Sequence, residues 1–311
     1  MKKKKEEIEE ELEDEEELEE EEVEEEFVEH KSHKFLNFII FLVIFVILLV
    51  LYAKYGGTKG LEVKEYRVES NILTTNYSGL KIVHFSDLLY KSTINKNDVK
   101  KLVNRINELN PDIIVFTGDL VNKNAKITES DTEYLIESLS LLKANIGKYT
   151  ISGDYDYSYK DYEKVMDKSD FKLIDNSYEE ILYKTNDPLY IVGFPSSLKE
   201  SADIYSAFEF YEDDNRNFII LLVHDGKSIK ALDESTYEVD MILGGHSLNG
   251  SVVLPFYGGL FVDDTSYKYS EPEIQKGITK IFISSGLGTN KYGYRFLNKP
   301  SFNFYRLKAQ P

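Results

Sequence analysis

Five short apolar segments of this 311-residue chain each end beside an Asp or a His. The segments are KIVHFS (81–86), DIIVFT (112–117), KYTIS (148–152), FIILLV (218–223) and DMILG (240–244), and the residues at their ends are Asp87, Asp119, Asp154, His224 and His246. Carboxylates and imidazoles together suit a divalent metal ion of the hard-to-borderline type. Strand ends that meet at one edge of a sheet would bring such a ligand set together.

The same residue types also have ordinary structural uses. An Asp after a strand commonly caps a helix or forms a turn, and a single His at such a place is more often structural than a ligand. Residues 60–311, however, contain only three histidines, and two of them, His224 and His246, stand at strand ends. The third, His84, is expected on the opposite strand face from Asp87, in a structural role. The joint pattern favours a metal site.

The five segments are short and rich in β-branched and aromatic residues, which predicts buried strands. Glycine precedes three of the end residues, in GD (118–119), GD (153–154) and GH (245–246), where it would allow sharp turns. Residues 97–110 and 132–145 carry apolar side chains at three- and four-residue spacing, which predicts amphipathic helices. Strands that alternate with helices in this way predict an α/β sheet sandwich.

The amino-terminal part of the chain has a different composition. Residues 1–34 are rich in Lys and Glu and predict an acidic, solvated tail with transient helix. Residues 35–53 are almost wholly apolar, and as a helix they would span about 28 Å, close to the ~30 Å bilayer core. We therefore expect a single-pass transmembrane helix that binds the lipid bilayer through residues 35–53, a linker at 54–61 and one folded domain at 62–311.

Charge and composition exclude several function classes. The formal net charge is −18, of which residues 1–30 carry −14 and the remainder −4, so the domain lacks the basic face of a nucleic-acid-binding protein. The absence of cysteine excludes disulfides, thiolate zinc sites and cysteine nucleophiles. The absence of a G-x-S-x-G elbow and of a Walker loop argues against serine hydrolases and P-loop proteins.

The order of the motifs resembles that of the calcineurin-like metallophosphoesterase family. The motifs of this chain are SDLL (86–89), GDLVN (118–122), GDYD (153–156), VHD (223–225) and GHSLNGS (245–251). The family is marked by D-x-H, G-D-x-x-D/N, G-N-H-D/E, a lone H and G-H-x-H in the same order, and its terminal S-x-G-L-G-T…R-F segment is similar to ISSGLGTNKYGYRF (283–296). The resemblance implies an α/β fold, a four-layer αββα sandwich of two mixed sheets, with two metal ions at the strand ends.

The resemblance also implies two sets of metal ligands, of which one is complete. Its members are Asp119, Asp154, His224 and His246, with Asp154 where the family has Asn. The other set corresponds to Asp87, Leu89, Asp119 and Leu248, so leucine replaces both of its imidazoles and Asp87 is a remnant. We therefore expect one divalent ion (Mn, Fe, Zn or Mg) and no other cofactor, with Leu89 and Leu248 packed together in the second site.

The catalytic positions that the resemblance implies are Tyr155, at the acid–base histidine, and Asp156, at its acidic partner. The ordinary Tyr pKa of about 10 suits proton transfer at neutral pH poorly, and loss of an acid–base residue typically costs about 10²–10⁴-fold. We expect weak hydrolysis of a phosphodiester or phosphomonoester. One alternative is a catalytically inactive family member that serves as a tethered binding or scaffolding module. Another is an acidic-tailed membrane organiser with a vestigial domain.

The side of the membrane on which the domain lies is left open by the sequence. More basic residues follow the apolar segment than precede it, which mildly favours a cytoplasmic domain, although long domains translocate largely regardless of charge. Anchored relatives in the resembled family are often held outside the cytoplasmic membrane. The resemblance therefore favours an extracytoplasmic domain.

Overall fold

The computed structural model describes residues 33–212, 216–233, 235–260, 262, 266–289 and 292–310. The acidic tail expected over residues 1–34 lies outside the described residues, apart from His33 and Lys34. The chain divides into two units, Met1–Tyr52 and Ala53–Pro311, which are described separately below.

The first unit contains one apolar helix. The helix runs from His33 to Gly56 and ends in a π-helical turn, η1 (Tyr52–Gly56). Its large apolar side chains are exposed, and by length and composition it could cross a membrane. The helix contains the apolar segment 35–53, as expected for a single-pass membrane protein.

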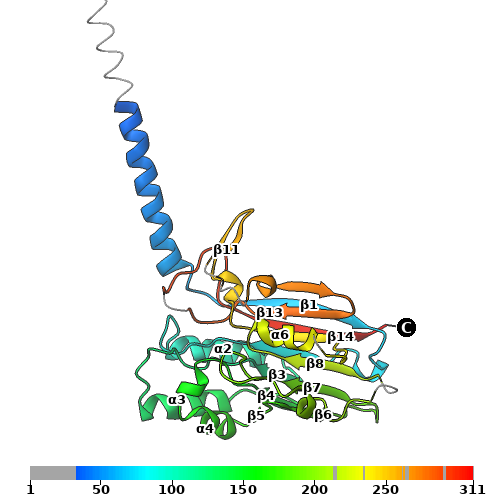
Figure 1. Cartoon of the computed structure of the whole chain (residues 1–311). Coiled ribbons are helices and arrows are strands. Elements are labelled where there is room, and N and C mark those ends of the chain that lie inside the picture. The colour runs from blue at the N-terminus through cyan, green and yellow to red at the C-terminus, as the bar shows by residue number, and fades with distance from the viewer. Residues whose placement is uncertain are drawn as a thin grey trace, which may run out of the picture. The chain divides into compact units, whose positions relative to one another are not determined.

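Two six-stranded mixed sheets form the centre of the second unit (Figure 1). The first has the order β1 (Glu62–Ser70), β14 (Ser301–Ala309), β2 (Lys81–Phe85), β3 (Ile113–Phe116), β4 (Gly147–Thr150), β5 (Lys172–Leu173). The second has the order β12 (Glu273–Lys276), β13 (Thr279–Ile283), β9 (Met241–Gly244), β8 (Phe218–Leu222), β7 (Leu189–Gly193), β6 (Ser177–Ile181). Strands β2 to β5 are parallel to one another, as are β7, β8, β9 and β13.

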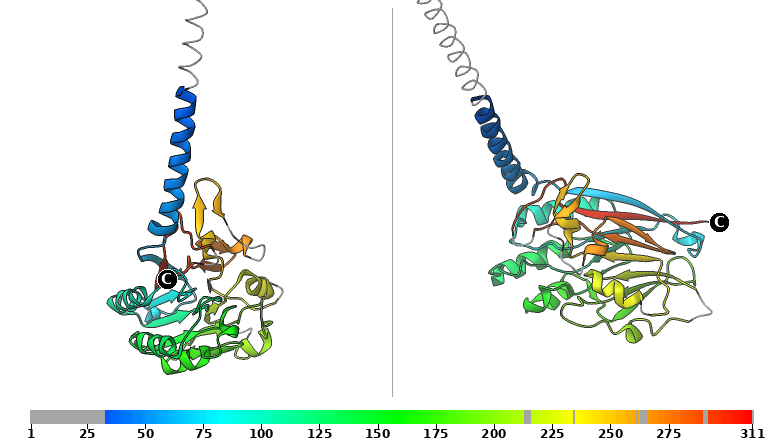
Figure 2. Two further views of the ribbon diagram at one scale, coloured as in Figure 1. Left: turned by 90° about the vertical axis from the view of Figure 1, so that its left-hand side faces the viewer. Right: turned by 45° about the horizontal axis from the view of Figure 1, so that its top comes forward.

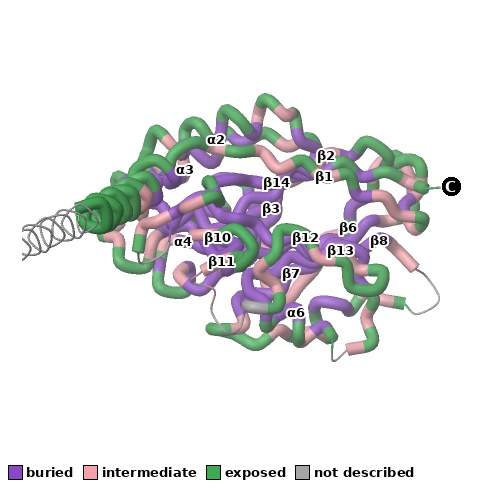
Figure 3. The backbone as a smooth tube through the Cα atoms, turned by 90° about the horizontal axis from the view of Figure 1, so that it is seen from above, coloured by how far each residue is buried: buried purple, intermediate pink, exposed green. Residues whose placement is uncertain are grey.

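The sheets pack face to face because successive side chains of each strand point to opposite faces. Ile82 of β2 and Leu243 of β9 belong to one buried cluster between the sheets, whereas their neighbours Val83 and Ile242 face outward, into two further clusters. Figure 3 shows that the inner strands of both sheets are mostly buried, whereas the edge strands β1, β5, β6 and β12 are largely exposed or partly exposed. Three apolar cores therefore separate four layers, and the expected αββα sandwich is confirmed.

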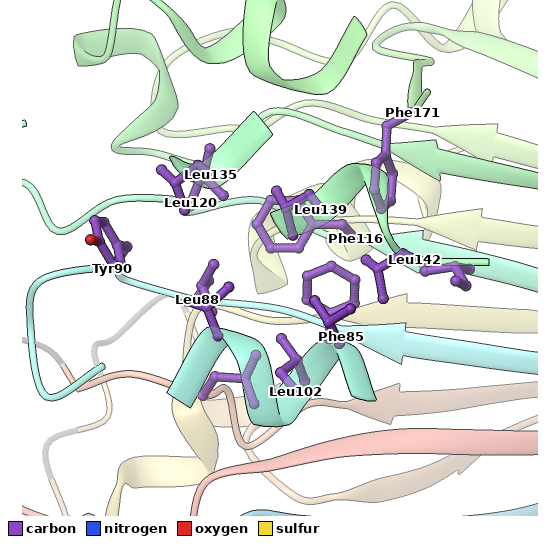
Figure 4. Packing of buried hydrophobic residues seen from close by; sticks show 14 of the residues in the cluster. Phe85, Leu88, Tyr90, Leu102, Phe116, Leu120, Leu135, Leu139, Leu142 and Phe171 are labelled. Carbon is purple, nitrogen blue, oxygen red and sulfur yellow. The ribbon is translucent and has the colours of Figure 1, made fainter. Parts of the chain in front are cut away.

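Helices cover both outer faces. α2 (Lys96–Glu108), α3 (Glu129–Ser140) and α4 (Tyr162–Lys168) pack on the first sheet, where Phe85 and Phe116 meet Leu102 and Leu139 (Figure 4). α5 (Ile204–Ala207) and α6 (Gly226–Asp233) pack on the second sheet. α3 begins three residues before the expected range, because Thr128 and Asp131 form a capping box that starts the helix at Glu129.

The remaining elements are short. They are the one-turn helices η2 (Thr75–Tyr77), η3 (Asp156–Ser158), η4 (Leu248–Gly250) and η5 (Tyr267–Tyr269), and the hairpin of β10 (Val252–Leu254) and β11 (Gly258–Leu260). The expected linker at 54–61 packs on the domain: a Cβ at Gly57 would lie 1.8 Å from the Arg295 carbonyl oxygen, and Thr58 is buried.

Candidate metal centre

The five predicted strand-end residues lie at one edge of the two sheets. β2, β3 and β4 are parallel neighbours in one sheet, and β8 and β9 are parallel neighbours in the other. Hydrogen bonds join the two sheets at this edge: His246 N–H donates to Asp87 Oδ2 at 3.0 Å, and His224 Nδ1 donates to the Thr117 carbonyl at 2.7 Å. The residues that follow the strands of one sheet are thus hydrogen-bonded to those that follow the strands of the other.

His224 is held as a ligand would be. Its ring is fully buried, and donation from Nδ1 to a carbonyl leaves Nε2 as the atom that faces the carboxylates. Nε2 lies 3.6 Å from Asp119 Oδ2 and 4.0 Å from Asp154 Oδ1, and it forms no hydrogen bond within the described part of the chain. A buried nitrogen aimed at two carboxylates without a hydrogen bond is suited to a cation between them.

His246 completes the group from the neighbouring strand end. Its Nδ1 lies 3.3 Å from Asp154 Oδ2, and its ring centroid is 5.2 Å from that of His224. One ligand atom from each of Asp154, His224 and His246 lies within 4.8 Å of the others. Asp87, Asp119 and His224 form a second group by the same measure, so the Asp87 remnant remains beside the retained ligands.

The glycines that precede the proposed ligands allow neighbouring ligand side chains to approach the backbone, and only one of them is needed for a turn. Only Gly118 has a positive φ, +93°; a Cβ at Gly153 would lie 2.6 Å from Asp119 Oδ1 and 2.8 Å from His224 Cε1. A Cβ at Gly245 would lie 2.7 Å from Asp87 Oδ2. The expected reason for these glycines, a sharp turn, therefore holds at Gly118, whereas the other two make room for the neighbouring ligand.

Backbone strain collects at the same edge. Asp87, Asp119 and His246 have φ values of +50°, +64° and +63°, and the replaced positions Leu89 and Leu248 have +45° and +52°. The left-handed region costs an L-residue roughly 1–2 kcal/mol, and such strain clusters where function constrains the backbone. The leucines thus retain the backbone conformation of the neighbouring ligand positions.

The carboxylates make this edge strongly attractive to positive charge. Burial alone lowers the pKa of His224, but Asp119, Asp87 and Asp154 outweigh burial and raise that pKa well above its ordinary value. Burial raises the pKa of Asp154, yet hydrogen bonding and attraction from His246, together with the charge of His224, hold it at about 2. Both pKa shifts show that the carboxylates favour positive charge at this site, which a bound proton or a metal ion would provide.

Tyr155 and Asp156 have different roles in the structure. The Tyr155 N–H donates to Asp119 Oδ1 at 2.8 Å, and burial beside Asp119, Asp154 and Asp87 raises the pKa of its phenol to about 12. Asp156 accepts three backbone hydrogen bonds, from Asp119 at 2.7 Å, Gly153 at 2.8 Å and Leu120 at 2.9 Å. Asp156 thereby fixes the two loops that carry Asp119 and Asp154.

The two leucines at positions of the second ligand set lie against one loop. Leu89 and Leu248 are buried, and both lie against the loop 284–288: a Cβ at Gly286 would lie 2.3 Å from Leu248 Cδ2, and one at Gly288 would lie 2.5 Å from Leu89 Cβ. We predicted that the two leucines pack on each other; the structure shows that they share this loop as a neighbour.

Arg295 stabilises the same loop through hydrogen bonds to its carbonyl groups. Its fully buried guanidinium donates from Nη2 to the carbonyls of Ser285 at 2.8 Å, Gly286 at 3.0 Å and Gly288 at 2.6 Å. Burial lowers the pKa of Arg295 to about 10, while the charge of Asp87 raises it, so the group stays positive at neutral pH. A fixed positive charge therefore stands close to the remnant of the second site.

Ser196 was missed from the sequence. It follows β7, the strand beside β8, and its buried hydroxyl donates to Asp154 Oδ1. The signal was present, since the segment LYIVGFPSS (189–197) is another apolar segment that ends in polar residues. Ser is a weaker hint of a ligand site than Asp or His, because hydroxyls at strand ends more often serve turns.

The residues present fit a divalent ion. His224 is shared by two groups of potential ligands, one with Asp154 and His246 and one with Asp87 and Asp119. Its buried Nε2 has no hydrogen-bond partner in the described residues. Mixed nitrogen and oxygen donors suit Zn, Fe or Mn, and less closely Mg.

Comparison with known proteins finds similarity over most of the chain. The family described as calcineurin-like phosphoesterase matches residues 80–250. The uncharacterized metallophosphoesterase YkuE of Bacillus subtilis is 31% identical over 252 residues, which cover 80% of this chain and 86% of that protein. A transmembrane protein with metallophosphoesterase domain from Danio rerio is 23% identical over 73% of this chain and 53% of its own. A UDP-2,3-diacylglucosamine pyrophosphatase of Chlamydia muridarum is 24% identical over 75% of this chain and 85% of its own.

Proposed function

Because this chain belongs to the calcineurin-like phosphoesterase family, we propose that it is a membrane-anchored hydrolase of phosphate esters that works with a single divalent ion. The ligands proposed for that ion are Asp119, Asp154, His224 and His246. The observation that carries the proposal is the buried Nε2 of His224, which faces Asp119 and Asp154 without a hydrogen bond in the described chain. A buried polar atom is rarely left without a partner.

The single ion follows from what occupies the other ligand positions. Leu89 and Leu248 offer no donor atom, both are buried, and the loop 284–288 lies against them. Arg295 adds a positive charge near Asp87, which offsets some of the charge that a second ion would have neutralised. These features support one ion at this edge.

The chemistry expected here is limited. A bound divalent ion would act as a Lewis acid toward a phosphoryl oxygen, without the symmetric two-metal clamp. Tyr155, with its raised pKa, stays protonated at neutral pH, so it can donate a hydrogen bond to a phosphate oxygen and cannot act as a base. His246, the only half-buried member of the ligand set, marks the side from which a substrate would approach. We therefore expect slow turnover.

The substrate class is suggested by the anchor and by one relative. A chain held at a bilayer meets amphiphilic phosphate esters at high local concentration, and a relative is named for the hydrolysis of UDP-2,3-diacylglucosamine, a pyrophosphate. A cavity of about 220 Å³ beside Tyr155 is lined by Lys123 and Lys160. Lys123 Nζ lies 5.9 Å from the Tyr155 ring. Asp161 also lines this cavity, so its charged lining is two lysines and one carboxylate. The remaining positive charge would suit the phosphate or pyrophosphate part of such a lipid.

The catalytically inactive alternative rests on the same replacements. Leu89, Leu248 and Tyr155 remove both imidazoles of one site and the acid–base histidine. In that case the chain would bind an ion and a phosphate-bearing partner without turnover. The extracytoplasmic placement of the domain remains part of this proposal, and a protease-protection assay in sealed vesicles tests it.

Hydrolysis of bis-p-nitrophenyl phosphate by the full chain in detergent micelles tests the function. The chain is first stripped with a chelator and then supplied with Mn²⁺, Zn²⁺, Fe²⁺ or Mg²⁺ one at a time. We expect slow turnover that depends on the ion, is abolished by Asp119→Asn and is kept by Asp233→Asn, a charge-matched control on α6. Ion binding without turnover in any of these conditions would favour the inactive alternative, and turnover that survives chelation or Asp119→Asn would refute the metal-dependent mechanism.

A further inference from the structure

The β10–β11 hairpin is an apolar projection of the domain. It spans residues 252–260, VVLPFYGGL, which contain no charged residue. It belongs to neither large sheet, and Figures 1 and 2 show it standing clear of them. Phe256 at its tip is 111% exposed and Tyr257 is 76% exposed. Two largely exposed aromatic side chains leave apolar surface in water, which contact with a partner surface would remove.

The base of the hairpin is tied to the end of the apolar helix. Val252 forms a β-bridge with Phe296, and the Val253 N–H donates to the Phe296 carbonyl at 2.9 Å. The preceding residue, Arg295, donates its N–H to the carbonyl of Ala53 at 2.9 Å. A Cβ at Gly57 would lie 1.8 Å from the Arg295 carbonyl oxygen, so the backbones pass in close contact.

The hydrogen bonds from the hairpin base to Phe296, and from Arg295 to Ala53, bring the hairpin base close to the residues that leave the apolar helix. Ala53 is covalently bonded to Tyr52, the last residue of the apolar-helix unit. If the helix spans a bilayer, Ala53 to Gly57 must lie at one membrane surface. The hairpin base is hydrogen-bonded to Phe296, and the adjacent Arg295 is hydrogen-bonded to Ala53. Covalent and hydrogen-bonded structure therefore keeps the base of the hairpin close to the residues that leave the apolar helix.

The chemistry of the region matches the membrane interface. Aromatic residues are enriched where headgroups meet hydrocarbon, and long basic side chains extend toward the headgroups. Tyr55 and Tyr294 flank Lys54, whose Nζ lies 5.9 Å and 5.8 Å from their ring centroids. Open strand edges are not tolerated in the hydrocarbon core, so a two-stranded hairpin suits the interface rather than deep insertion.

We propose that the tip of the β10–β11 hairpin, Phe256 and Tyr257, inserts into the interface of the same membrane that holds the apolar helix. The partner is the lipid bilayer itself. The hairpin follows the proposed ligand His246 by way of η4 (Leu248–Gly250). In a consequence that rests on the proposed function, insertion would hold the metal centre beside the lipid surface and favour amphiphilic substrates.

The absence of tryptophan from the chain gives a direct test. Phe256→Trp places a single tryptophan at the tip, which can be excited selectively among the tyrosines. Tyr205→Trp, on α5 at a position 83% exposed, is the matched control. The full chain of each variant is reconstituted into nanodiscs that contain either ordinary phosphatidylcholine or phosphatidylcholine brominated on its acyl chains. We expect blue-shifted Phe256→Trp emission that is largely lost with brominated lipid, and unshifted, unquenched Tyr205→Trp emission.

The outcomes separate the possible occupants. Equal quenching of the two variants would overturn the proposal, and so would a blue shift at Phe256→Trp without quenching, which would indicate a second copy or another protein on the hairpin. If Phe256→Trp fails to fold, as judged by circular dichroism, Tyr257→Trp takes its place with the same expectations. None of these readouts depends on hydrolysis, so their failure is distinguishable from failure of the proposed enzymatic function.

Discussion

The Nε2 atom of His224 and the Oδ2 atom of Asp119 lie 3.6 Å apart, on residues that follow strands of two different sheets. The separation is too long for a good hydrogen bond and short enough for both atoms to bind one ion. The two sheets therefore meet at a point where each places one proposed ligand atom close to the other.

The first prediction concerns this contact. His224→Ala should lower the affinity for Zn²⁺ or Mn²⁺ by more than the about 10–100-fold that loss of a supporting contact costs, because it removes a ligand outright. Isothermal titration of the chelator-stripped chain measures the change. His84→Gln, at the other fully buried histidine of the domain, is the control and should leave the affinity unchanged. Equal affinities for His224→Ala and the unmodified chain would contradict the assignment.

The second prediction concerns the number of ions. The unmodified chain should retain one ion per chain, and the double variant Leu89→His, Leu248→His should retain two. Histidine tolerates the left-handed backbone of both positions at least as well as leucine, so the change adds little strain. Metal analysis after dialysis gives the stoichiometry. Two ions in the unmodified chain would show that the second site is not lost.

The third prediction concerns Ser196. Ser196→Ala removes the hydroxyl that donates to Asp154 and should weaken ion binding by roughly 10–100-fold. The adjacent Ser197 offers a matched control, because its hydroxyl donates to Asp225 at 2.6 Å instead of to a proposed ligand. Titration of both alanine variants with the same ion decides the matter. A similar loss in Ser197→Ala would mean that the loop as a whole, rather than the Asp154 contact, sets the affinity.

The fourth prediction concerns the loop 284–288, which lies against Leu89 and Leu248. Gly286 and Gly277 have φ values of +67° and +57°, but only Gly286 faces Leu248 and Asp87; a Cβ at Gly277 would meet nothing within 4 Å. Gly277→Ala should cost about 1 kcal/mol of unfolding free energy from the backbone alone. Gly286→Ala should cost roughly 1–3 kcal/mol more from overpacking. Urea unfolding followed by tyrosine fluorescence measures both, and equal costs would show that the loop yields freely.

The fifth prediction concerns pH. His84 is fully buried, with Nε2 2.9 Å from the Thr117 hydroxyl, and burial lowers its pKa from 6.5 to about 3. Between these values the unfolded chain binds a proton that the folded chain does not, so stability is complete above about pH 6.5 and falls with decreasing pH. Relative to His84→Gln, the unmodified chain should lose up to about 1.4 kcal/mol per pH unit in that window. The free energy of unfolding of both proteins is measured as a function of pH. If it changes equally with pH in the two, His84 binds a proton as readily in the folded chain as in the unfolded chain, and the prediction is wrong.

The sequence determined the local features of this protein. Five apolar segments became the strands β2, β3, β4, β8 and β9, because short β-branched runs bury both faces only inside a sheet. The period-two side-chain alternation alone also places His84 on the opposite strand face from Asp87. The almost wholly apolar segment 35–53 fixed a helix long enough for a bilayer, since a helix satisfies its own backbone hydrogen bonds in that setting.

Only the tertiary structure decided which of these features meet. The pairing of Asp119 with His224 depends on how two sheets face each other, and sequence periodicity carries no information about that packing. The contact of Ser196 with Asp154, the burial of Arg295 behind Gly286, and the hydrogen bond from Arg295 to Ala53 join residues 42, 9 and 242 positions apart. Long-range contacts of this kind are set by the packing of the whole core, in which the same polar or apolar residue can be accommodated against many different neighbours.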